Sequence, residues 1–161
     1  MGDTIYSRLV QHPLLAGLPL GAIEGFVPGA RDVEFGRGDL VLTEGAPAGT
    51  LFLLEHGKVA LSTHAPGKGH LLVQTLGPGE VLGLSWLFPP FQWKFDARAI
   101  EPVTTIALEG AYVRAKLDED PALGYEMLKR VMPVVLERLQ QTRFRLLDLY
   151  GKAPADVSTH A

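Results

Sequence analysis

The residues best suited to ligand chemistry gather in one stretch, PGEVLGLSWLFPPFQWKFDARA, from Pro78 to Ala99. Its first half contains Gly79 and Gly83 and begins with a tight turn, a backbone of the kind that offers N–H groups to a phosphate. Its second half holds both tryptophans of the chain and three of its seven phenylalanines, where a phosphate site would need charge. These rings could fill a former pocket, line a pocket for a flat or apolar ligand, or form a surface for a partner.

Other reactive residue types are sparse. The chain has no cysteine, which excludes disulfides, thiolate catalysis and cysteine-ligated zinc. The segment GLSWL, from Gly83 to Leu87, lacks the second glycine of a nucleophile elbow. No two histidines are separated by one residue, the spacing with which cupins hold a metal, so a cupin-like metal protein is only a minor alternative. The sequence predicts no catalytic residues, no metal site and no required cofactor. The histidines are His12, His56, His64, His70 and His160.

Composition narrows the choice of partners. The 161 residues fit one domain with an ordinary globular composition, and the formal net charge of −3 provides no positive field for nucleic acid or an anionic membrane. The N-terminus lacks the pattern of a signal peptide, and no run approaches the roughly 20 apolar residues that span a bilayer. We therefore expect a cytoplasmic protein with no direct DNA binding and no membrane contact.

Three zones of different periodicity must position the Pro78–Ala99 stretch. About residues 4–31 have helical spacing and predict short helices. Residues 32–108 form short runs rich in valine, leucine and threonine between glycines, typical of an antiparallel roll of about eight strands. Within it, His56 and Gly57 are predicted to form the corner of a hairpin between TLFLLE and KVALS. Residues 109–150 are predicted to be helical and 151–161 to be a tail.

The last zone contains a heptad pattern. Asp120 and Pro121 suit the N-cap and the first position of a long helix. Apolar residues then alternate steps of four and three, with charged residues such as Arg138 on the flanks, which favours a seam between the helices of a homodimer. The alternative is packing of the helix on its own sheet. Pro133 is expected to kink the helix about a turn earlier. The predicted seam is Leu128, Met132, Val135, Leu139, Thr142, Leu146 and Leu149.

The order of these zones, together with the text FGRGDLVLTEGAPAGTLFLLEHGKVAL, resembles the cyclic-nucleotide-binding domain of the catabolite-activator (Crp/Fnr-like) regulators. The resemblance covers about Leu14 to Tyr150. It implies an α+β fold: a jelly-roll-like antiparallel β-roll, or double-stranded β-helix, with short N-terminal helices and a long C-terminal dimerisation helix. We expect a single domain over residues 1–161, with a phosphate-binding cassette at residues 79–99.

In that family the cassette has a glycine, a glutamate for the ribose, and an arginine and a serine or threonine for the phosphate. In this sequence the family's glycine corresponds to Gly83 and its glutamate to Leu84. The arginine falls near Lys94, with Trp93 as the alternative. The serine or threonine falls on Phe95 or Asp96. Leu84 accepts no hydrogen bond, and a carboxylate at position 96 would repel a phosphate. A threonine such as Thr142 can face the base in the family, or it can set the register of the seam. The candidate ligand-binding residues are Gly83, Leu84, Ser85, Trp86, Lys94, Phe95, Asp96 and Thr142.

The regulators of this family continue into a helix-turn-helix domain, whereas this chain stops shortly after the long helix. We therefore expect a stand-alone regulatory or sensor module with a divergent cassette, acting through an unknown protein partner rather than on DNA itself. The ligand would be a cyclic nucleotide, with cAMP and cGMP disfavoured by Leu84 and Phe95, or another small molecule. The alternative is a ligand-free dimerising adaptor whose aromatic loop fills the pocket or forms an interface.

Overall fold

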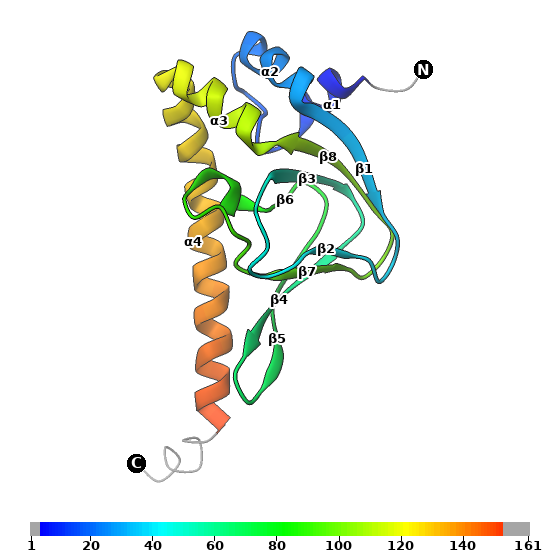
Figure 1. Cartoon of the computed structure of the whole chain (residues 1–161), viewed down its shortest axis with the longest axis vertical. Coiled ribbons are helices and arrows are strands. Elements are labelled where there is room, and N and C mark those ends of the chain that lie inside the picture. The colour runs from blue at the N-terminus through cyan, green and yellow to red at the C-terminus, as the bar shows by residue number, and fades with distance from the viewer. Residues whose placement is uncertain (1–3, 153–161) are drawn as a thin grey trace.

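In the computed structural model, which describes residues 4–152, two four-stranded sheets form a roll (Figure 1). Three of its four α-helices lie at one end of the roll, and the fourth, the longest, runs along its side. The helices are α1 (Ile5–Gln11), α2 (Leu20–Phe26), α3 (Gly110–Glu119) and α4 (Pro121–Lys152). The strands are β1 (Ala30–Phe35), β2 (Leu40–Leu42), β3 (Thr50–His56), β4 (Val59–Ala65), β5 (Gly69–Leu76), β6 (Val81–Leu82), β7 (Asp96–Ala99) and β8 (Val103–Glu109). Short 3-10 turns span Val27–Gly29 and Leu84–Leu87. The predicted α+β roll between helices is confirmed.

The two sheets have the antiparallel strand orders β1-β8-β3-β6 and β2-β7-β4-β5. Consecutive strands therefore lie in different sheets, except β4 and β5, which pair with each other. Strand β3 pairs with β8 and β6, and the other partner of β4 is β7. The predicted hairpin at His56 and Gly57 is wrong, because this corner carries the chain from one sheet to the other. Gly57 has φ of 89°, and an added Cβ would lie 2.2 Å from the Pro102 carbonyl oxygen, so the corner still requires glycine.

The β1-β8-β3-β6 sheet separates two apolar clusters. Strand β3 is buried on both faces: Leu51 and Leu53 belong to the cluster beneath the helices, and Phe52 and Leu54 belong to the interior of the roll. The continuous apolar run in TLFLLE follows from this position, since a strand covered on both sides has no solvent face. The helices and the roll thus share one central sheet.

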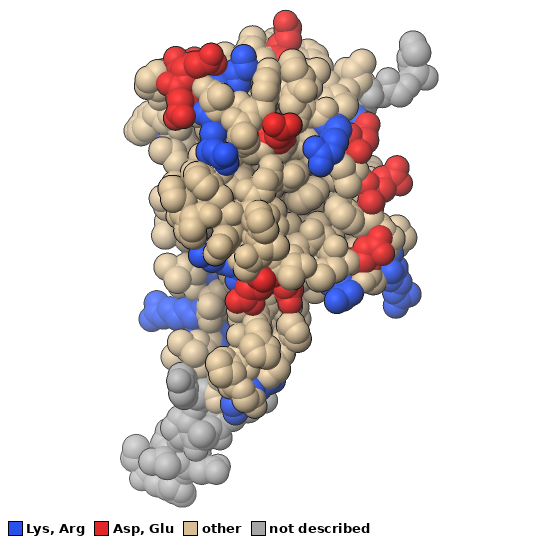
Figure 2. Space-filling view, viewed as in Figure 1, with Lys and Arg blue, Asp and Glu red and all other residues tan. Residues whose placement is uncertain are grey.

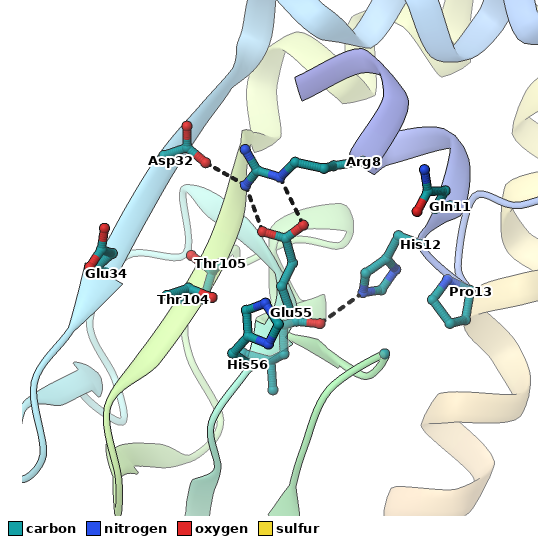
Figure 3. A pocket seen from close by; sticks show the side chains of 12 residues that line it. Arg8, Gln11, His12, Pro13, Asp32, Glu34, Glu55, His56, Thr104 and Thr105 are labelled. Atoms are coloured by element: carbon teal, nitrogen blue, oxygen red, sulfur yellow. Dashed lines mark hydrogen bonds and ion pairs between the residues drawn. The ribbon is translucent and has the colours of Figure 1, made fainter. Parts of the chain in front are cut away.

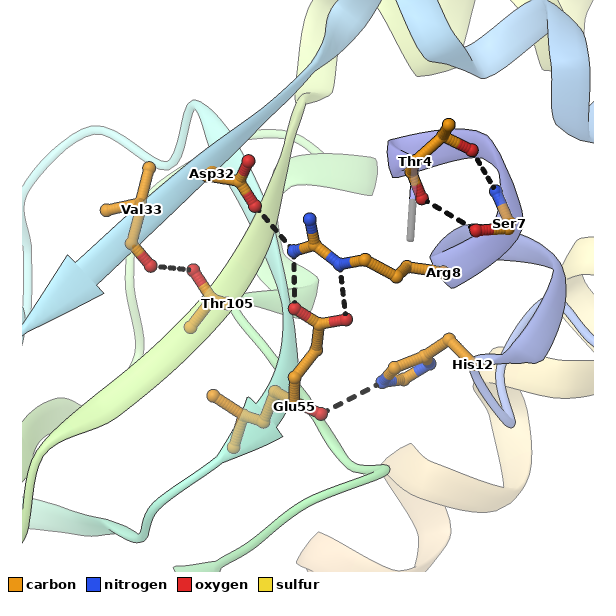
Figure 4. A network of polar contacts seen from close by, with 9 residues as sticks. Thr4, Ser7, Arg8, His12, Asp32, Val33, Glu55 and Thr105 are labelled. Atoms are coloured by element: carbon orange, nitrogen blue, oxygen red, sulfur yellow. Dashed lines mark hydrogen bonds and ion pairs between the residues drawn. The ribbon is translucent and has the colours of Figure 1, made fainter. Parts of the chain in front are cut away.

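Helix α1 is fixed to this sheet by polar contacts (Figure 4). The Arg8 guanidinium donates to both carboxylate oxygens of Glu55 on β3, at 3.0 and 2.6 Å, and to Asp32 on β1 at 2.5 Å. The hydrogen bonds to these two carboxylates raise the pKa of Arg8 above its ordinary value. One turn later, the His12 side chain contacts the Leu54 carbonyl oxygen at 3.2 Å. The α1–β3 contact is therefore polar on its outer side and apolar beneath.

Helix α4 begins as predicted, with Pro121 as its first residue and the Asp120 carboxylate accepting from the Leu123 N–H at 3.2 Å. It continues without a break through Pro133 and runs along one side of the roll, beyond the β4–β5 hairpin (Figure 1). One face packs on its own domain through Leu123, Met127 and Val131. The predicted tail began at residue 151, but α4 includes residues 151 and 152, and the rest of that tail, 153–161, lies outside the described residues. Among residues 4–152, no helix is both long and apolar enough to cross a bilayer.

Candidate ligand-binding site

Within the cassette segment, residues 79–99, the chain leaves strand β6 through Gly83, which has a left-handed backbone conformation. Gly83 has φ of 94°, and a Cβ at this position would lie 2.8 Å from the Thr50 carbonyl oxygen and 2.9 Å from the Trp93 ring. The chain then makes the 3-10 turn Leu84–Leu87 and returns as β7. Glycine is required here on two counts, because only glycine adopts this φ without strain and only a hydrogen leaves room for the indole ring.

A cavity of about 460 Å³ lies between this segment and α4. We call it the α4 cavity. Leu84, Phe88, Trp93 and Phe95 form much of its wall on the cassette side, and α4 contributes Val135, Arg138, Leu139 and Thr142. Its size falls in the range of small-molecule sites. The aromatic rings of the cassette segment therefore leave an open cavity beside α4.

Six of the eight candidate ligand-binding residues line the α4 cavity: Gly83, Leu84, Ser85, Lys94, Phe95 and Thr142. Thr142 donates its hydroxyl hydrogen to the Arg138 carbonyl oxygen at 2.8 Å, which leaves its lone pairs free. The other two candidates lie elsewhere. Asp96 accepts from the Glu44 N–H at 2.7 Å and lies 3.4 Å from His70, and it is not part of the cavity wall.

Trp86 is the second candidate ligand-binding residue that lies outside the α4 cavity. It is fully buried in the cluster beneath the helices, where its carbonyl oxygen accepts from Arg114 of α3. The five aromatics of the cassette segment thus divide: Trp86 is core, Phe91 stacks under the Arg114 guanidinium at 4.3 Å, and the remaining three line the cavity. Arg98, the arginine of the cassette segment, lies on β7 and donates to the Gly38 carbonyl oxygen at 2.6 Å, which is a structural contact.

Arg138 was predicted to be a charged flank of the seam, but it is buried in the cavity wall, with 8% of its surface exposed. It donates to the Val81 carbonyl oxygen, and its Nε atom has no partner among the described residues. Burial lowers the pKa of Arg138 to about 10, so the group is a cation at neutral pH. A signal for this burial exists in the sequence, because Arg138 continues the spacing of Leu123, Met127, Val131 and Val134 on the inner face of α4.

The predicted seam is largely exposed on the single chain. Leu128, Met132, Leu139 and Leu146 are between 42% and 63% exposed. Val135, Thr142 and Leu149 are half-buried. Three members of the seam, at positions 135, 139 and 142, also line the α4 cavity. The seam and the cavity are therefore continuous.

A second, more polar cavity of about 560 Å³ lies between α1 and the sheet (Figure 3). Its arginine, Arg8, is already paired with Glu55 and Asp32, so among the described residues this cavity offers no unpaired lysine or arginine to an anionic ligand. His12 accepts from the Leu14 N–H through Nδ1, which leaves Nε2 to donate to Leu54. These groups satisfy one another, so we place the candidate site in the smaller α4 cavity.

The described part of the chain has no cluster of metal ligands, and the face shown in Figure 2 has no basic surface for nucleic acid. Within residues 4–152, no group of three or more histidine, aspartate or glutamate side chains is placed to hold a metal ion. His64 and His70 face each other across the β4–β5 hairpin, with ring centroids 5.7 Å apart. Lysine and arginine are interspersed with acidic residues on the face shown in Figure 2, which carries no extended basic patch. The size and the mainly apolar lining of the α4 cavity suit a small organic ligand.

The class of protein follows from comparison with known families. The model of the cyclic nucleotide-binding domain matches residues 32–120, and the chain belongs to this family. It is 26% identical, over 141 residues, to the CRP-like cAMP-activated global transcriptional regulator of Mycobacterium tuberculosis; the match covers 88% of this chain and 61% of that protein.

Two solved structures share the fold. A cyclic nucleotide-binding domain from Methylobacillus flagellatus superposes with a TM-score of 0.76 at 20% identity, covering 89% of this chain and 83% of that one. The regulatory subunit of a cAMP-independent protein kinase A from Trypanosoma brucei superposes with a TM-score of 0.68 at 19% identity, covering 90% of this chain and 50% of that one. The fold thus occurs in a protein described as cAMP-independent, so it does not by itself specify the ligand.

Proposed function

We propose that this chain is a regulatory module that binds a small ligand in the α4 cavity and signals through the seam on α4 to a protein partner. It acts as a homodimer, it is not an enzyme, and it does not itself contact DNA. The observation that carries the proposal is the continuity of the cavity with the seam. Leu139 and Thr142 belong to both, so a ligand that moves them changes the surface on which a second α4 would pair.

The divergent cassette supports a changed ligand rather than a lost site. The contacts that the family resemblance implies for ribose and phosphate fall on Leu84, Lys94 and Phe95, none of which reproduces the expected glutamate, arginine or hydroxyl group. A cavity nevertheless remains beside them. A ligand-free adaptor would have no need of such a cavity, which is why the module is proposed as ligand-binding.

The exposed apolar seam supports pairing with a second copy. A row of exposed leucine and methionine side chains on one helix is costly in water, and burial contributes about 25 cal/mol for each Å² covered. Met132 tests this pairing without touching the ligand site, because it belongs to the seam and does not line the cavity. We expect light scattering to show a wild-type dimer at micromolar concentration and a monomer for Met132→Lys.

The matched control is Glu137→Lys, which places the same side chain on another, exposed face of α4. It should remain dimeric. A wild-type protein that is monomeric at micromolar concentration would contradict the proposal, as would a Met132→Lys variant that pairs as tightly as the wild type.

A further inference from the structure

Arg138 is the one charged side chain that α4 buries among the described residues, and its charge has no counter-ion there. No described carboxylate forms an ion pair with it, and its single hydrogen bond is to the Val81 carbonyl oxygen. Removing a guanidinium from water without an anionic partner is costly. The free protein therefore holds an unsatisfied positive charge in the wall of the α4 cavity.

Glu80 is the carboxylate whose charge acts on Arg138, since its attraction raises the pKa of the guanidinium against the larger effect of burial. It does not neutralise the arginine. The Glu80 carboxylate is exposed and accepts from the Gly77 N–H at 2.8 Å. The position next to Arg138 inside the cavity thus remains available for an anion from outside the chain.

The rest of the cavity wall is mainly apolar. Leu84, Phe88, Trp93, Phe95 and Leu139 present hydrocarbon and aromatic surface to the interior. A ribose would bring hydroxyl groups against this surface, where they would lose their hydrogen bonds to water. An apolar chain or ring would instead be desolvated at no such cost.

These observations together define the ligand class. We propose that the α4 cavity binds an apolar monocarboxylic acid and that Arg138 of α4, rather than a residue of the cassette segment, pairs with its carboxylate. The planar fork of a guanidinium matches a carboxylate with two parallel hydrogen bonds. The inference rests on the proposed function, because it names the ligand of the same cavity.

Matched pairs of ligands test this proposal on the full chain. The probes are decanoate with decan-1-ol and 4-phenylbutyrate with 4-phenylbutan-1-ol, each titrated by calorimetry. We expect each acid to bind about tenfold or more tightly than its alcohol, the effect of one charge-assisted hydrogen-bonded pair. Arg138→Met should abolish the preference for the acid. Lys94→Met removes the other cation that lines the cavity and should retain it.

The outcomes separate this inference from the proposed function. If each alcohol binds as tightly as its acid, or if the preference follows Lys94 instead of Arg138, the inference is wrong and the cavity is still a ligand site. Titration with cAMP and cGMP is the further comparison. If either nucleotide binds and the acids do not, the inference is wrong and the cavity is still a ligand site. If none of these compounds binds, both proposals fail. Should Arg138→Met not fold, Lys94→Met decides: a retained preference for the acid supports Arg138, and a lost preference overturns the inference.

Discussion

Gly83 shows how one residue sets the geometry of the site. Its left-handed backbone turns the chain from β6 into the cassette segment, and its missing side chain leaves room for the Trp93 ring in the cavity wall. Backbone conformation and ring packing thus place separate demands on the same position.

A pair of substitutions separates these demands. Gly67 also has a positive φ, of 74°, but an added Cβ would meet nothing within 4 Å. We expect Gly67→Ala to lower the free energy of unfolding by about 1–2 kcal/mol through backbone strain alone. Gly83→Ala should lower it by about 1–3 kcal/mol more, because the methyl group collides with Thr50 and Trp93. Urea denaturation of both variants measures the difference, and equal losses would show that the contact with Trp93 is not tight.

The sequence predicted which residues of the cassette segment belong to the site better than it predicted where each side chain points. The sequence indicated that the segment keeps the frame of the family and replaces its polar contacts, and six of the eight candidates do line one cavity. Trp86 could not be separated from the other aromatics, since composition does not tell which ring points under the helices. Arg138 was missed because its charge was taken as a sign of exposure, although its helical spacing places it on the buried face.

At the level of elements, the docking of α1 on β3 depends on a buried neutral histidine. His12 ends α1, accepts from the Leu14 N–H and donates to the Leu54 carbonyl oxygen, which together use both ring nitrogens of the neutral form. Burial lowers the pKa of His12 below its ordinary value of 6.5. The unfolded chain therefore binds a proton more readily than the folded one.

This difference gives a pH dependence with a definite sign. Stability is fully present above about pH 6.5 and is lost as the pH falls below that value, by up to about 1.4 kcal/mol for each pH unit. The loss ends once the pH is below the lowered pKa of the folded state. We expect His12→Asn to be less stable at pH 7 and to have a flatter profile between pH 6.5 and 5.

The control for this profile is His56→Asn. The His56 side chain is exposed, and its imidazole is hydrated in the folded and unfolded states alike. This variant should keep the slope of the wild type in denaturation experiments at successive pH values. Identical slopes for the wild type and His12→Asn would contradict the role given to the buried imidazole.

The start of α4 could be predicted because local chemistry fixes it, whereas strand pairing was predicted wrongly because it depends on long-range contacts. Asp120 and Pro121 start α4 as predicted, because capping and proline placement are local effects. The pairing of β3 with β4 was wrong, because a glycine turn between two apolar runs is the same in a hairpin and in a crossing between sheets. Only the long-range pairing of β3 with β8 distinguishes them.

At the scale of the whole molecule, α4 has three distinct faces. Its inner face packs on its own domain, its seam is exposed on the single chain, and residues between and along these faces line the cavity. A ligand in the cavity would therefore lie against the same helix that pairs in the proposed dimer. This arrangement requires no transmission through the roll, since one rigid element contacts both sites.

The central claim is that the α4 cavity is a ligand site, and the two tryptophans allow a direct test. Trp93 lines the cavity, whereas Trp86 is buried in the core beneath the helices. With ¹⁵N-labelled tryptophan, NMR resolves the two indole N–H signals, and Trp93→Phe assigns them. On titration with 4-phenylbutyrate, cAMP or cGMP, we predict that at least one ligand moves the Trp93 signal saturably and leaves the Trp86 signal in place. If neither signal moves with any of the three at millimolar concentration, the claim is wrong.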